Sequence, residues 1–157
     1  MREVDLAEVV AIEAASFPRP WSADAFRAEL ARPFAHCLVL REPASGASGS
    51  VGAIVANLVF WVLAGEAQLL NVAVRPDRRG QGLGRQLVAQ VVTTAETAGA
   101  RLVTLEVRRS NAAAVALYAA LGFAVVAVRA RYYQDNDEDA LVMERALVPP
   151  EVAHAPA

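Results

Sequence analysis

Apolar residues recur every three or four positions in several segments of the chain and gather in shorter runs elsewhere. The first pattern indicates one buried face of an α-helix, whereas short apolar runs bounded by turn residues are typical of strands. In chain order, the predicted elements are a helix over 5–15, a helix over 22–30, strands over 35–40, 51–59 and 68–74, a helix that begins within 80–84 and ends at Gly99, a strand over 102–107, a helix over 111–121, and strands over 123–128 and 140–143.

Polar residues mark where the first two helices begin. Asp5 and Glu8 have the spacing of a capping box, which predicts that Asp5 caps the first helix. Ser22 follows a segment broken by two prolines and is expected to cap the second helix.

The order of the elements predicts an α/β (α+β) fold. Strands and helices are interleaved without strict alternation, so we expect a central sheet, mixed and mostly antiparallel, with helices on both faces. A chain of 157 residues suits one domain, which we expect over 1–147. Three prolines fall within 148–157, which predicts a flexible C-terminal tail.

Composition and charge exclude several classes of protein. The formal net charge is −2 and the pI is about 5.7, without the basic excess of a general nucleic-acid binder. The acidic residues in 1–8 argue against a signal peptide, and the apolar stretch 51–63 is too short to span a bilayer. A single cysteine, Cys37, excludes a disulfide framework and a cysteine-based metal site. We therefore expect a cytoplasmic protein that binds no metal, membrane or nucleic acid.

A glycine-rich turn is the first candidate binding site. Gly80, Gly82 and Gly84 alternate between a predicted strand and a predicted helix. Backbone N–H groups at a helix N-terminus bind anions, and glycine lets a phosphate approach closely. Arg85 stands where the dinucleotide fingerprint needs its third glycine, and the Gly-Lys-Ser/Thr of a nucleoside-triphosphate loop is absent. The turn is either a phosphate site of another kind or an ordinary tight turn.

Two blocks of sequence resemble the GNAT superfamily of N-acetyltransferases. Residues 71–84 (NVAVRPDRRGQGLG) resemble its acetyl-CoA signature. The second block, residues 105–114 (LEVRRSNAAA) with Leu117-Tyr118 and 121–123, resembles the RimI-like branch, the bacterial ribosomal-protein-alanine N-acetyltransferases. The likeness extends over roughly 5–145. It departs from the family at the start, where only 1–4 could supply the usual first strand, so that strand is either very short or lies upstream.

The resemblance implies a set of site residues. The main chain of Val72, Ala73 and Val74 would hold the pantetheine arm of acetyl-CoA, and Asn111 would contact the same cofactor. The pyrophosphate would be bound by the glycine turn, formed by Arg79, Gly80, Gln81, Gly82, Leu83, Gly84 and Arg85. Glu106 falls on the family's general base and Tyr118 on its general acid. Taken singly, Glu106 could be a solvated carboxylate, Tyr118 a core residue and Asn111 a helix cap.

The side chains of Glu106 and Tyr118 suit acetyl transfer to an amine. The attacking amine must be neutral, and the leaving thiolate must receive a proton. An α-amine with a pKa near 8 is roughly 10% neutral at pH 7, against about 0.04% for a lysine amine. Glu106 therefore needs to be only a modest base for an α-amine. No metal and no covalent intermediate are required.

The acceptor is expected near the C-terminal strands. An acidic run follows Tyr132 and Tyr133, and we expect these tyrosines to line the acceptor groove while Glu138 and Asp139 attract a basic peptide. The alternative is a solvated loop. The resemblance implies the N-terminal alanine of a small-subunit ribosomal protein as acceptor. A lysine side chain, a small-molecule amine, and a non-catalytic acyl-CoA-binding module remain alternatives.

Overall fold

The computed structural model describes residues 1–46 and 51–147. The predicted tail over 148–157 lies outside the described residues. In chain order the elements are η1 (Glu3–Asp5), α1 (Leu6–Ser16), α2 (Ala23–Leu30), β1 (Ala35–Arg41), β2 (Ile54–Leu63), β3 (Glu66–Val74), η2 (Pro76–Arg78), α3 (Leu83–Thr97), β4 (Leu102–Arg108), α4 (Ala112–Ala120), β5 (Ala124–Tyr133) and β6 (Glu138–Ala146).

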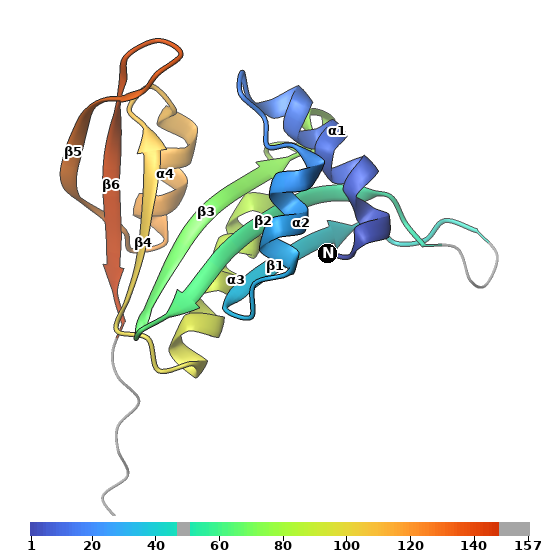
Figure 1. The fold of residues 1–157 in the computed structure, drawn as a ribbon, viewed down its shortest axis with the longest axis horizontal. Helices are drawn as coiled ribbons and strands as arrows, with labels where there is room; N and C mark the ends of the chain where they lie inside the picture. Colours follow the sequence, from blue (N-terminus) through green and yellow to red (C-terminus); the bar gives the residue numbers. More distant parts are fainter. Residues whose placement is uncertain (47–50, 148–157) are drawn as a thin grey trace, which may run out of the picture.

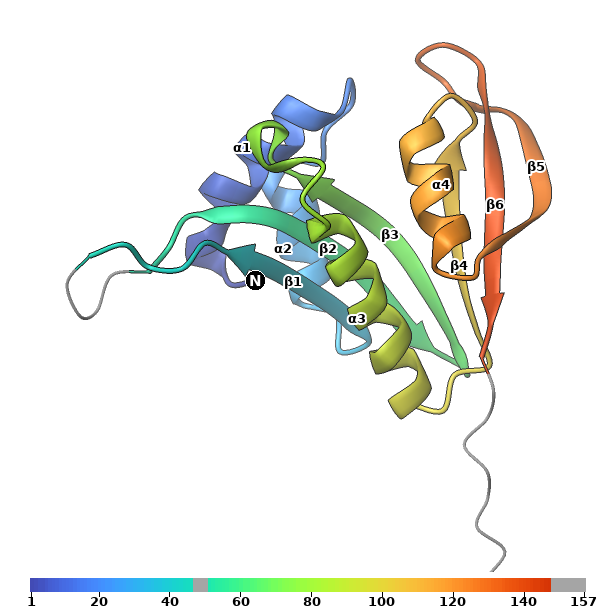
Figure 2. The same cartoon turned by 180° about the vertical axis from the view of Figure 1, so that it is seen from behind.

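The strands form one six-stranded sheet in the order β1-β2-β3-β4-β6-β5. All neighbours are antiparallel except β3 and β4, which run parallel because α3 crosses over between them. Figure 1 shows α1 and α2 against one face, and Figure 2, from behind, shows α3 and α4 against the other. The predicted fold class is confirmed.

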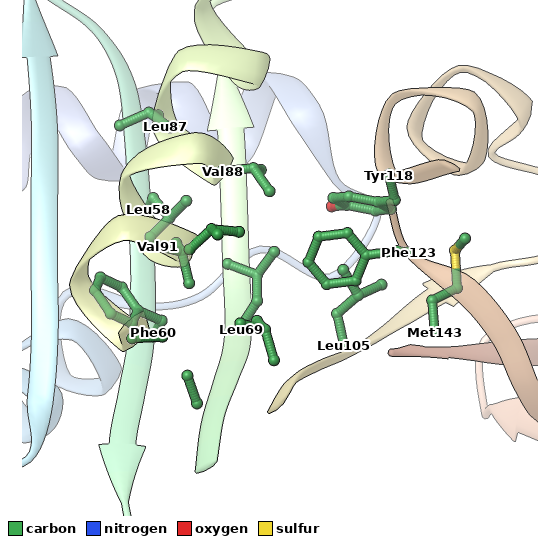
Figure 3. Close-up of a cluster of buried hydrophobic side chains, with 14 of the residues drawn as sticks. Leu58, Phe60, Leu69, Leu87, Val88, Val91, Leu105, Tyr118, Phe123 and Met143 are labelled. Atoms are coloured by element: carbon green, nitrogen blue, oxygen red, sulfur yellow. The ribbon is translucent and has the colours of Figure 1, made fainter. Parts of the chain in front are cut away.

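Each face of the sheet has its own hydrophobic core. The larger core lies under α3 and α4, where Leu58, Leu69, Val91 and Leu105 are buried together with Phe123 (Figure 3). The smaller core lies on the other face of the sheet, between the helices α1 and α2 and the strands β1, β2 and β3. Its buried members are Leu6, Val9, Ile12, Phe26, Ile54, Val59 and Ala73. None of the helices formed by the described residues has the length and apolar character of a membrane-spanning helix.

The first helix does not begin with the predicted capping box. Asp5 is at the N-cap but makes no cap hydrogen bond. Its carboxylate accepts hydrogen bonds from the backbone N–H of Arg2, at 2.6 Å, and from the guanidinium of Arg41. Glu8 accepts from the backbone N–H of Ile54 at 2.8 Å. The capping prediction was wrong because Asp5 instead binds Arg2 in the preceding turn and Arg41 on β1, while Glu8 binds β2. The Ser22 cap of α2 is confirmed, with its hydroxyl 3.2 Å from the N–H of Ala25.

Several strands have other bounds than predicted. β2 begins three residues later than predicted and continues to Leu63, where Ala64 and Gly65 turn the chain with φ of 53° and 79°. Two consecutive residues with positive φ make the tight hairpin whose twist matches the flanking strands. β5 and β6 likewise extend further, to Tyr133 and back to Glu138.

The described chain has a short 3₁₀ turn at Glu3–Asp5 before α1 instead of a first strand. The ammonium group of Met1 donates to the carbonyl of Cys37 at 2.9 Å, so the N-terminus touches the free edge of β1 at one point. In the described residues, β1 is one edge strand of the sheet and β5 is the other.

The sheet splits between its two parallel strands. β3 and β4 pair only from Glu66–Leu102 to Leu69–Leu105, and both strands continue beyond that point. Opposite β2 the register shifts at the same place, so Leu70 is an extra residue on β3. Such a bulge bends a strand, and β3 turns away from β4 directly after their last pair (Figures 1 and 2).

Candidate active site

The split between β3 and β4 opens into a groove of about 510 Å³. Main-chain groups of β3 beyond Leu69 have no strand partner on the β4 side, so they are available to a ligand. Six of the predicted site residues line this groove together; they are Val72, Glu106, Asn111, Tyr118, Tyr132 and Tyr133.

A second groove of about 480 Å³ leads from the split to the glycine turn. It shares Val72, Asn111 and Tyr118 with the first. The other predicted cofactor residues that line it are Ala73, Val74, Arg79, Gly80, Gly82, Leu83, Gly84 and Arg85. Of the predicted set, Gln81 is not among the residues that line either groove in the described part of the chain.

The glycine turn leaves the N-terminus of α3 open. Gly80 and Gly82 have φ of 74° and 79°, which side chains rarely adopt, and a Cβ at either position would meet no protein atom within 4 Å. Gly82 is the N-cap and supplies no side chain to the first N–H groups of α3. An open space in front of free N–H groups and a helix dipole fits a phosphate.

Arginines and a carboxylate hold this turn from outside. Glu42 accepts hydrogen bonds from Arg78 at 2.6 Å and from Arg75 at 3.0 Å, and the bond from Arg78 holds the pKa of Glu42 below its ordinary value. Arg79 points elsewhere: it donates to the carbonyl of Val74 at 3.1 Å and to the hydroxyl of Ser16 at 3.0 Å. Arg79 therefore connects the end of α1 to the end of β3.

Glu106 stands on the open face of β4. Its neighbours Leu105 and Val107 point into the core under α3 and α4, so strand alternation directs Glu106 to the opposite face. The carboxylate is 2.9 Å from Nε of Arg129 on β5. A hydrogen bond with Glu106 raises the pKa of the Tyr132 phenol. The carboxylate is thus oriented by two groups and still lines the groove.

Tyr118 comes from α4 on the other side of the sheet. Its ring packs edge-to-face on Phe123 at 5.9 Å, and Figure 3 shows its hydroxyl pointing away from α4. Burial raises its pKa to about 12. Asn111 caps the same helix by accepting from the N–H of Ala114 at 3.2 Å. Core packing and helix capping are therefore real roles of Tyr118 and Asn111, and both side chains also line the grooves.

The hairpin of β5 and β6 forms the wall of the first groove on the side away from α1. The guanidinium of Arg108 lies 3.9 Å from the ring centre of Tyr133 and is bound to Asp135 at 2.9 and 3.0 Å. Glu138 accepts from the backbone N–H of Ser110 at 2.7 Å, and its contacts with Ser110 lower its pKa to about 2.

Two predicted acceptor residues have partners within the protein. Glu138 and Asp139 are not among the residues that line either groove in the described chain, whereas Asp135 is. That Glu138 and Asp139 attract a basic peptide therefore stays a prediction.

A buried carboxylate lies behind the groove, and sequence reasoning missed it. Glu13 on α1 is fully buried and accepts hydrogen bonds from Asn57 at 3.3 Å and Asn71 at 3.1 Å. Burial raises its pKa. The helical spacing from Leu6 and Val9 was the signal available, because it puts position 13 on the buried face.

Arg129 had no such signal, because it lies on β5, two strands away from Glu106 across β6, and only the sheet pairing brings the two together.

Comparison with known proteins gives the family. The model of the acetyltransferase (GNAT) family matches residues 6–123. The chain is 39% identical to a Bacillus subtilis (strain 168) protein provisionally named a ribosomal protein bS18-alanine N-acetyltransferase, over 91% of this chain and 90% of that one. It is 34% identical to the Escherichia coli (strain K12) ribosomal protein bS18-alanine N-acetyltransferase, over 91% and 92%. The crystal structure of the ribosomal-protein-S18-alanine N-acetyltransferase from Escherichia coli superposes with a TM-score of 0.81, at 33% identity, over 99% of this chain and 96% of that one. The chain belongs to the GNAT family of acetyltransferases, in its RimI-like branch.

Proposed function

We propose that this protein transfers an acetyl group from acetyl-CoA to the α-amine of the N-terminal alanine of a small-subunit ribosomal protein, in the cytoplasm. The observation that carries the proposal is the split in the sheet, where Glu106 and Tyr118 line one groove beside an open helix N-terminus. The names of the bS18-alanine N-acetyltransferases at 34% and 39% identity support the choice of acceptor.

The second groove suits acetyl-CoA. Apart from the carbonyl of Val74, which accepts from Arg79, the main-chain groups of 72–74 that face the split would bind the amide groups of the pantetheine arm much as a neighbouring strand would. The N–H groups of 80–85 would bind the pyrophosphate, with Arg85 at the rim. Asn111 lies where both grooves meet and would contact acetyl-CoA near its reacting end.

The two faces of the sheet divide the proton transfers. Bound acetyl-CoA supplies the acetyl group as a thioester. As the N–C bond forms and the C–S bond breaks, Glu106 takes a proton from the amine on one face, and Tyr118 donates one to the sulfur from the other. With a pKa of about 12, Tyr118 gives up a proton to a free thiolate only at a cost of about 5 kcal/mol. Tyr118 therefore passes its proton to the sulfur while the C–S bond is breaking, and not to a thiolate that has already left.

The acceptor would enter from the face that carries Glu106. Tyr132 and Tyr133 line that end of the groove together with Phe17 and Trp21 from the segment between α1 and α2. Asp135 adds a carboxylate there. These groups suit a short extended peptide, with its α-amine toward Glu106 and a basic side chain near the acidic hairpin.

A turnover assay with three peptides tests the proposal. The first begins Ala-Arg, the second is the same peptide with a blocked N-terminus and an added lysine, and the third has both amines blocked. We expect acetylation of the first alone, detected by mass spectrometry. All 15 cationic side chains of the enzyme are arginine, so it offers no lysine of its own to the label. Acetylation of the second peptide would favour a lysine acceptor, and no acetylation of any peptide, with acetyl-CoA bound, would favour a binding module.

A further inference from the structure

The strand β5 is distorted where it passes the active site. Its register against β6 shifts between Arg129, opposite Ala140, and Tyr133, opposite Glu138. Three residues of β5, 130–132, therefore stand opposite the single residue Asp139. In the middle of them Arg131 has a φ of 50°. A non-glycine residue is strained in this left-handed conformation, so the surrounding structure must hold it.

The distortion decides which side chains reach the groove. Adjacent residues of a regular strand point to opposite faces, so Tyr132 and Tyr133 could not both line one groove on a regular β5. Here both do, with their rings edge-to-face at 5.2 Å. Arg129, which precedes the bulge, reaches Glu106. The bulge thus brings both tyrosines to the groove, directly after the last regular pair of this part of β5, Arg129 with Ala140.

One side chain holds this backbone. Oδ1 of Asp139 accepts a hydrogen bond from the backbone N–H of Arg131 at 3.0 Å. The other carboxylate oxygen is 3.3 Å from the guanidinium of Arg109, which is 57% exposed. An exposed ion pair contributes little, whereas a hydrogen bond from a backbone group to a carboxylate is among the stronger kinds. Asp139 is therefore tied to the conformation of β5.

We propose that Asp139 is a positioning residue for the acceptor site, acting through the N–H of Arg131 and not by its charge on the peptide. It stabilises the bulge that turns Tyr132 and Tyr133 into the groove. This rests on the proposed function, because it assigns these tyrosines to the acceptor.

Two substitutions of Asp139 separate the hydrogen bond from the charge. Asp139→Asn keeps an oxygen acceptor for the N–H of Arg131 and removes the charge, whereas Asp139→Ala removes both. We expect Asp139→Asn to keep the acceptor KM and kcat within about threefold, and Asp139→Ala to raise the acceptor KM about tenfold or more. The KM for acetyl-CoA should stay unchanged in both. Arg109→Gln is the matched control, because it breaks the ion pair alone, and it should behave like Asp139→Asn.

A second substitution distinguishes a loss of positioning from misfolding if Asp139→Ala is poorly folded. Glycine adopts positive φ without the cost that arginine incurs, so Arg131→Gly in the Asp139→Ala background should recover most of the acceptor KM. Equal losses for Asp139→Asn and Asp139→Ala, largest for a peptide beginning Ala-Arg and reduced by salt, would overturn the proposal in favour of charge attraction. Failure of Arg131→Gly to restore KM would also count against it. Absence of peptide turnover by the wild-type enzyme would refute the proposed function instead.

Discussion

Replacing Glu106 by glutamine removes a base and changes little else at the active site. The side chain keeps its length and one carbonyl oxygen, which can still accept from Arg129, now 2.9 Å from the carboxylate. Position 106 also stays on the open face of β4, because its neighbours Leu105 and Val107 remain in the core. The Glu106→Gln variant should therefore fold normally and bind acetyl-CoA as the wild type does.

The expected loss depends on pH in a way that identifies the base. General base catalysis is worth about 10²–10⁴-fold, so kcat for an Ala-Arg peptide should fall at least about a hundredfold at pH 7. Without a base in the site, only acceptor that is already neutral reacts. An α-amine with a pKa near 8 is about 1% neutral at pH 6 and about 90% neutral at pH 9. The deficit of the variant should therefore shrink by close to two orders of magnitude over that range.

Steady-state kinetics from pH 6 to pH 9 measure this directly, with release of free CoA followed by a thiol reagent. Titration calorimetry with CoA checks that the cofactor site is intact. A deficit of less than about threefold at every pH would remove Glu106 from the chemistry. A large deficit that does not change with pH would mean that Glu106 orients the acceptor without taking its proton.

Three further predictions concern other parts of the molecule. Tyr118→Phe should lower kcat about tenfold to a hundredfold and leave the affinity for CoA unchanged. Because the pKa of Tyr118 is about 12, a pH–rate profile of the wild type should show no loss of activity below pH 10 from ionisation of this phenol. Gly82→Ala and Gly99→Ala place a side chain at φ of 79° and 72° in open space, so both should lose about 1 kcal/mol of stability in urea unfolding, but only Gly82→Ala should weaken CoA binding. Burial raises the pKa of Glu13 above its unfolded value, so its contribution to stability is present at low pH and lost as pH rises. The Tm of Glu13→Gln relative to wild type should therefore improve from pH 5 to pH 8, and a difference that stays constant would contradict the raised pKa.

Local signals in the sequence predicted most of the elements. The helix caps at Ser22 and Asn111 formed as expected because their partners lie three residues away. The capping box at Asp5 failed because Asp5 binds the N–H of Arg2 before it and the guanidinium of Arg41, which lies 36 residues along the chain and beyond any local pattern. Strand ends were less accurate, since hairpin pairing carries a strand past its last alternating residue.

The residues of the candidate site were predicted through a resemblance to a family, but the geometry that brings them together was not predicted from the sequence. The residues 71–84 and 105–118 identify the family, but the split that joins them depends on the extra residue Leu70. A bulge has no reliable sequence signal, because it shifts a register without changing composition. For the same reason the contact of Arg129 with Glu106, and the left-handed Arg131, could not be foreseen.

The buried Glu13 is a different case. Its spacing on α1 placed it on the apolar face, and a carboxylate there indicates buried polar partners. The partners themselves, Asn57 and Asn71, lie on two strands distant in sequence, so only the position of Glu13 was predictable.

A structure of the chain bound to a conjugate of CoA with the α-amine of an Ala-Arg peptide tests the central claim most directly. We expect the pantetheine arm along 72–74, the pyrophosphate at 80–85, and the first peptide residue between Glu106 and Tyr132. The sulfur should lie within hydrogen-bonding distance of the Tyr118 hydroxyl. A conjugate bound outside the split between β3 and β4, or with its peptide on the face of α3 and α4, would contradict the account.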